Sequence, residues 1–97
     1  MNEVNREGDS YIVDKNEIEK IILYMIGKYR PNNTISVYDK LIGKESCLNM
    51  TSLEIISLIV DIELEFGIII KKDRELMTVE DIIGEVYNQT KMIVEIL

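Results

Sequence analysis

The chain lacks the residues that most catalytic and metal sites need. Its 97 residues include no histidine and a single cysteine, Cys47. Without histidine, a Ser-His-Asp triad, a Cys-His pair and a zinc site with histidine ligands are excluded within the chain. One cysteine excludes an internal disulfide framework and a cysteine-rich metal site. Only carboxylates are left as catalytic groups, and none lies in an apolar context that would tune its pKa, so we expect no enzyme activity of the chain's own.

Positive charge is also scarce. Eleven Lys and Arg residues stand against 18 Asp and Glu residues, which gives a net charge of −7. Nucleic acids and anionic membrane surfaces are therefore disfavoured as partners, because phosphate groups are bound by clusters of basic residues. The balance fits partner proteins with basic patches, attracted by electrostatic steering, although it would equally keep a small protein soluble.

The sequence has no apolar segment that is typical of a signal peptide or a membrane span. Residues 1–8 are polar, and the most apolar region, residues 55–70, is interrupted by four polar or acidic residues. We expect a cytoplasmic monomer with a flexible tail at residues 1–10 and one domain at residues 11–97.

Apolar periodicity predicts three main helices in this domain. The first starts near residue 16, is capped by Asp14 or Asn16, and ends before Pro31. The second starts at Thr51 or Ser52 and stops at Gly67. The third follows a capping box at residues 78–81 and reaches toward the C-terminus, and its inner face is built from four residues. These four are Ile82, Ile83, Val86 and Tyr87.

The second helix carries apolar and acidic residues in separate groups. Its apolar residues fall on or near one face, whereas three carboxylates share the opposite side, where a basic partner could dock. The apolar group is Leu53, Ile56, Val60 and Phe66, with Ile59 beside them, and the acidic group is Glu54, Asp61 and Glu65.

The two connections between the helices are expected to pack on the core. Residues 31–51 form a long connection with a turn at Gly43 and six apolar side chains that can cover the helices. These are Ile35, Val37, Tyr38, Leu41, Ile42 and Leu48. Residues 68–70 are predicted as an extended apolar stretch, because a lone strand would lack a pairing partner. A short helical turn is compatible with residues 73–76. The fold class is therefore an all-α bundle.

Three motifs together resemble the acyl carrier protein family. Residues 48–56 read LNMTSLEII, residues 62–70 read IELEFGIII, and residues 77–83 read MTVEDII. In that family an Asp-Ser-Leu motif begins the second helix, a Glu-rich segment ending in Phe-Gly closes it, and a Thr-Val-x-Asp-like cap opens the last helix. The resemblance covers roughly residues 15–90, and Thr51 stands where the family has aspartate.

The resemblance implies a four-helix bundle with a long first loop and a short third helix. It implies a 4′-phosphopantetheine arm joined through a phosphodiester to Ser52, which would hold an acyl group as a thioester. The partners implied are a phosphopantetheinyl transferase and the acyl-loading and acyl-processing enzymes of a fatty-acid, polyketide or specialised pathway. Thr51, Leu53, Glu54, Asp61 and Glu65 are the expected docking residues, and the start of a helix suits the charge of a phosphodiester.

Two alternatives stay open at this point. The chain fits an aminoacyl or peptidyl carrier as well as an acyl carrier. It also fits a protein-interaction module that keeps the bundle and is never modified, in which case Ser52 is an ordinary serine at a helix start. Cys47 is expected to be a partly buried loop thiol, and Met50, beside the proposed attachment point, is expected to pack in the core or loop.

Overall fold

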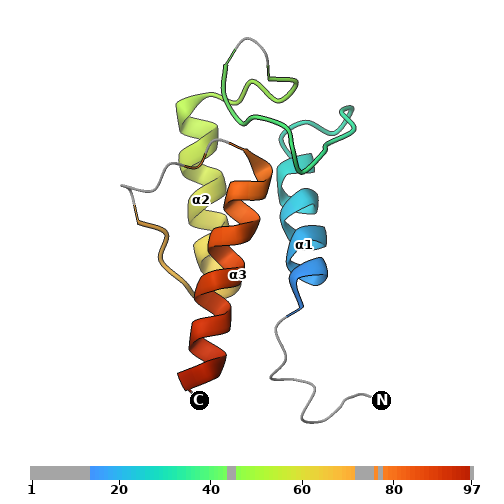
Figure 1. Ribbon diagram of the computed structural model, residues 1–97. Helices are drawn as coiled ribbons and strands as arrows, with labels where there is room; N and C mark the ends of the chain where they lie inside the picture. The colour runs from blue at the N-terminus through green and yellow to red at the C-terminus, as the bar shows by residue number, and fades with distance from the viewer. Residues whose placement is uncertain (1–13, 44–45, 72–75, 77, 97) are drawn as a thin grey trace.

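The computed structural model describes residues 14–43, 46–71, 76 and 78–96, with side chains described as far as Lys91. These residues form three helices: α1 (Lys15–Gly27), α2 (Ser52–Phe66) and α3 (Val79–Ile96). Figure 1 shows α1 running upward and both α2 and α3 running downward, with the long connection between α1 and α2 above them. Within the described residues no strand is present, and only Lys40 and Thr78 form an isolated bridge. The all-α class is therefore confirmed.

These three helices do not test the fourth helix of the predicted bundle. A short third helix would lie at residues 73–76, and residues 72–75 are outside the part of the chain that the structure describes. The predicted flexible tail at residues 1–10 is outside it as well.

Each helix begins with the cap that the sequence predicts. The Asp14 side chain accepts a hydrogen bond from a first-turn N–H of α1 at 2.9 Å. Thr51 and Glu54 form a reciprocal capping box at the start of α2, with N···O distances of 3.1 and 2.9 Å. Thr78 and Asp81 do the same at the start of α3, at 3.2 and 3.0 Å. These bonds satisfy N–H groups that a helix start leaves without intrahelical acceptors.

The core lies between the helices and is closed by the connections. Leu41 and Leu48 of the long connection are buried. Ile68 and Ile70, which lie outside any helix or strand, are buried as well, whereas Ile69 between them is 76% exposed. Tyr38, which is 74% exposed, and Ile42, which is 56% exposed, do not cover the core, so the prediction was wrong for these two. The helices contribute nine buried apolar residues: Ile18, Ile22, Ile26, Leu58, Ile62, Val79, Ile82, Ile83 and Val86.

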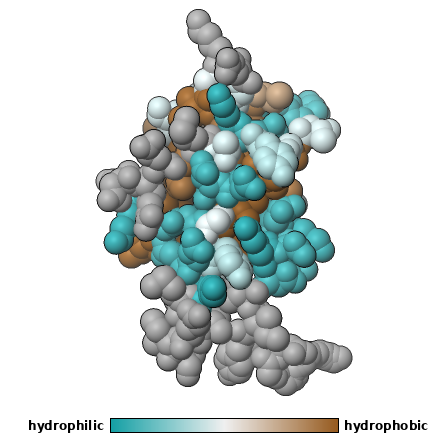
Figure 2. Space-filling model, in the orientation of Figure 1, coloured by the Kyte–Doolittle hydropathy of each residue, from teal (hydrophilic) through white to brown (hydrophobic). Residues whose placement is uncertain are grey.

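The face of α2 that packs against the core is not the face on which its apolar residues are most regularly spaced. Leu58 and Ile62 are fully buried, with Phe66 partly buried beside the core. Four apolar residues point outward instead: Leu53, Ile56, Val60 and Leu64, which are 45–78% exposed and are named here the outer stripe of α2. Figure 2 shows apolar atoms reaching the surface on the left-hand side, where Figure 1 places α2 and the segment that follows it. The predicted apolar face of α2 is thus largely a surface feature.

Two leucines of α2 test this assignment of faces. Leu58→Ala should lower the free energy of unfolding by about 2–5 kcal/mol, because it leaves a cavity in the core. Leu64→Ala removes the same atoms from an exposed position and should change it by less than about 0.5 kcal/mol. Urea denaturation followed by circular dichroism measures both, and equal losses in the two variants would contradict the orientation of α2.

Candidate functional site

Ser52 is the first residue of α2, and its side chain is exposed. Thr51, the cap residue before it, has an extended backbone, so the chain changes direction at Ser52 as it enters the helix. The N–H groups of Ser52 and Leu53 have no acceptor within the helix, because four residues before them the chain is not helical. A negatively charged group on the Ser52 hydroxyl would therefore lie at the positive end of the helix dipole.

The nearest carboxylate in sequence, that of Glu54, is not free to act as a base for Ser52. Its oxygens accept hydrogen bonds from the Arg30 guanidinium at 2.8 and 2.9 Å and from the Thr51 N–H at 2.9 Å. These bonds, the one from Arg30 first, hold the pKa of Glu54 at about 2, below its ordinary 4.5. So weak a base accepts a proton from a serine hydroxyl poorly. Glu54 therefore supplies no base to the exposed Ser52 hydroxyl.

The other predicted docking residues lie along α2 or at its cap, and they have different roles. Thr51 is occupied as the helix cap, and Leu53 is 77% exposed on the outer stripe. Asp61 and Glu65 are exposed on the side of α2 that faces α1. Tyr29 donates a hydrogen bond to Asp61 at 3.5 Å, and burial, followed by the charge of Asp61, raises the pKa of its phenol. Partner docking by these residues stays a prediction.

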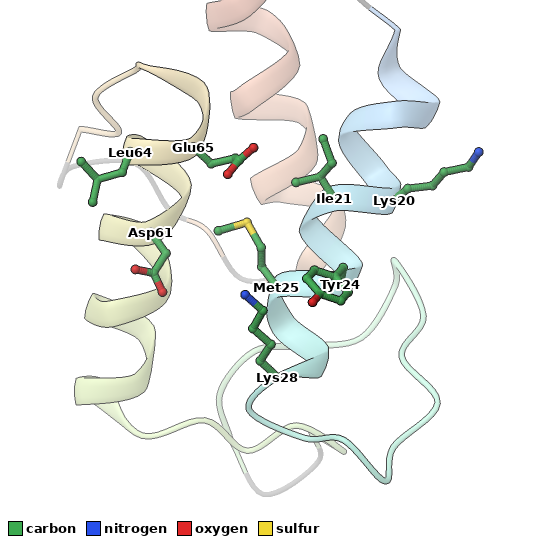
Figure 3. A pocket seen from close by; sticks show the side chains of 8 residues that line it. All are labelled: Lys20, Ile21, Tyr24, Met25, Lys28, Asp61, Leu64 and Glu65. Atoms are coloured by element: carbon green, nitrogen blue, oxygen red, sulfur yellow. The ribbon is translucent and has the colours of Figure 1, made fainter.

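A groove of about 640 Å³ separates α1 from α2. Figure 3 shows Met25 projecting between the two helices, with Ile21 and Glu65 pointing toward each other above it. Tyr24 lies in front, and the Lys28 ammonium lies 4.9 Å from the centre of the Tyr24 ring. The groove thus has an apolar floor and charged side chains along its edges, and the exposed carboxylates of α2 are among them.

A second groove, of about 510 Å³, runs along the other side of α2 and is mostly apolar. Seven of the nine described residues that line it are aliphatic, and Glu63 and Lys71 are the exceptions. The seven are Leu41, Ile55, Ile56, Ile59, Val60, Ile70 and Leu76. Ile55 and Ile56 are one helical turn from Ser52, so this groove begins close to the exposed hydroxyl.

Sequence reasoning overlooked two parts of this site. The prediction gave Arg30 no role beyond its place directly before Pro31, where the first helix was expected to end. No local signal links Arg30 to Glu54, which is 24 residues away. Leu53, Ile56 and Val60 of the outer stripe were predicted to share an apolar face of the second helix, but they were not predicted to be exposed. A signal for it exists, because α2 is apolar on more than one side. Met50 is buried, as expected, whereas Cys47 is exposed, so its predicted partial burial was wrong.

No protein-family model matches the chain, and no curated protein or solved structure matches it either. Within the described residues, no group of three or more acidic or cysteine side chains could hold a metal ion. None of the described helices combines the length and the apolarity needed to cross a membrane.

The ion pair between Arg30 and Glu54 predicts how the stability of the chain depends on pH. A carboxyl whose pKa is lowered by folding stabilises the chain above its unfolded value of 4.5 and loses that contribution as the pH falls toward about 2. A carbon-detected NMR titration should therefore place the midpoint of the Glu54 carboxyl near 2, and Arg30→Gln should raise it toward 4.5. A wild-type midpoint near 4.5 would show that the pair does not form in solution.

Proposed function

We propose that this chain is an acyl carrier protein, which holds an acyl group as a thioester on a 4′-phosphopantetheine arm attached to Ser52. The observation that carries the proposal is the position of Ser52. Its exposed hydroxyl lies at the start of a long helix, beside N–H groups that lack acceptors within the helix, and the neighbouring carboxylate of Glu54 is held in an ion pair. Such a hydroxyl suits a residue that is modified by another enzyme.

The attachment reaction is consistent with this site. The Ser52 oxygen would form a bond to the β-phosphorus of coenzyme A, the P–O–P bond would break, and adenosine 3′,5′-bisphosphate would leave. The serine proton would pass to a base of the transferase, since the Glu54 carboxylate has a pKa of about 2. The product is a phosphodiester with one negative charge, which the first-turn N–H groups and the dipole of α2 would stabilise.

The mostly apolar groove beside α2 favours an acyl cargo over an aminoacyl one. An acyl chain that enters it would gain about 0.8 kcal/mol for each buried methylene group. Its aliphatic walls offer few hydrogen-bonding groups to the charged amine of an aminoacyl cargo. An aminoacyl or peptidyl carrier stays the alternative within the same mechanism.

The partners that follow are a phosphopantetheinyl transferase and enzymes that load and process the acyl group. The exposed carboxylates of Asp61 and Glu65 would meet basic patches on these enzymes. Leu53 and the rest of the outer stripe would add apolar contact area close to the arm.

Incubation with coenzyme A and a broad-specificity phosphopantetheinyl transferase tests the proposal by intact-mass measurement. We expect the wild-type chain to gain the mass of one arm and Ser52→Ala to gain none. The matched control is Ser57→Ala, which removes another exposed hydroxyl of α2 and should keep the modification.

Two results would contradict the carrier. One is a wild-type chain that stays unmodified with several different transferases. The other is an arm found on a residue other than Ser52. The first result together with unimpaired cellular function of Ser52→Ala would favour the unmodified interaction module.

A further inference from the structure

The segment that leads into Ser52 is held at every residue of its backbone. The N–H groups of Leu48 and Asn49 donate to the Ser46 hydroxyl at 3.0 and 2.9 Å. The Met50 N–H donates to the Leu41 carbonyl at 2.8 Å, and the Met50 side chain is buried. The Thr51 N–H donates to the carboxylate of Glu54. These four consecutive N–H groups are therefore bonded within the protein.

Arg30 binds two carbonyl groups of this segment. Its Nε donates to the Leu48 carbonyl at 2.8 Å, and its Nη2 donates to the Asn49 carbonyl at 3.3 Å. The same guanidinium binds both carboxylate oxygens of Glu54, and Nη1 also donates to the carbonyl of Tyr29 at 2.7 Å. The side chains of Arg30 and Glu54 are 25% and 28% exposed, so the ion pair is partly shielded from water.

The segment also contains a residue with a left-handed backbone conformation. Asn49 has φ +39°, in a region that asparagine adopts more readily than most other non-glycine residues. Such a conformation persists when several surrounding bonds define it. Asn49 has two of these bonds, one from its N–H to Ser46 and one to its carbonyl from Arg30. Loss of Arg30 removes one of the two.

The ion pair and the cap of α2 share one atom. Glu54 Oε1 accepts from Arg30 Nη2 at 2.8 Å and from the Thr51 N–H at 2.9 Å. Arg30 therefore orients the carboxylate that fixes Thr51, the residue directly before Ser52. The planar guanidinium reaches three carbonyls and two carboxylate oxygens at once, whereas a lysine ammonium is a single point of charge.

We propose that Arg30 is a positioning residue for Ser52, which sets the geometry in which the Ser52 hydroxyl is offered to the enzyme that modifies it. The inference rests on the proposed function. Arg30 acts through residues 48–51 and Glu54. Its loss should slow the transfer step more than it weakens the encounter with the transferase, because the outer stripe and the exposed carboxylates of α2 are unchanged.

Steady-state kinetics of phosphopantetheinyl transfer from coenzyme A test this with Arg30→Gln. We expect kcat to fall about 10- to 100-fold while KM for the carrier changes less than about threefold. Arg30→Lys, which keeps the charge, should recover only part of kcat. The matched control is Lys28→Gln, which removes a positive charge at the same end of α1, from an exposed residue that contacts Tyr24, and should leave both constants unchanged.

A second readout separates positioning from a general loss of structure. Melting temperatures above the assay temperature establish that the variants are folded, and NMR order parameters of the amides at residues 48–51 should fall in Arg30→Gln but not in Lys28→Gln. If Arg30→Gln does not fold, Arg30→Lys carries the same comparison.

The possible failures are distinguishable. A wild-type chain that is modified at Ser52, with Arg30→Gln modified at an equal kcat, would overturn the inference and leave the carrier function standing. A fall in kcat that Lys28→Gln shares would overturn it too, since charge alone would then explain the effect. A wild-type chain that accepts no arm would contradict the proposed function and, with it, the inference.

Discussion

The ion pair between Arg30 and Glu54 is the constraint on which the site depends. It joins the end of α1 to the first turn of α2, and the same guanidinium binds the carbonyls of Leu48 and Asn49. Because Glu54 is also half of the capping box of α2, the pair links the packing of the helices to the exact place where α2 begins. Ser52 is therefore exposed to solvent but held on a fixed backbone, which is the combination that a modified residue presented to other proteins needs.

Local signals in the sequence predicted most of the fold. The caps at Asp14, Thr51 and Thr78 and the stop at Gly67 are each decided by interactions within a few residues. The backbone N–H groups of a helix start must find acceptors nearby, so a side chain three positions away defines the boundary. The start of α2, and with it the position of Ser52, follows from such a signal.

The features that the sequence did not predict depend on contacts between distant parts of the chain. Arg30 and Glu54 are 24 residues apart, and no spacing rule pairs them. The outer stripe was misjudged for a related reason: α2 has apolar residues on opposite sides, and only the packing of α1, α3 and the connections decides that Leu58 and Ile62 are buried while Leu53 and Leu64 are exposed.

The central claim is that Ser52 carries a prosthetic arm. Tandem mass spectrometry of the chain isolated from the cells that produce it measures this most directly, because fragmentation locates a phosphodiester on a single residue and releases the pantetheine arm with its cargo. The account predicts an arm on Ser52, in part acylated through its thiol. An isolated population in which Ser52 is entirely unmodified would contradict it.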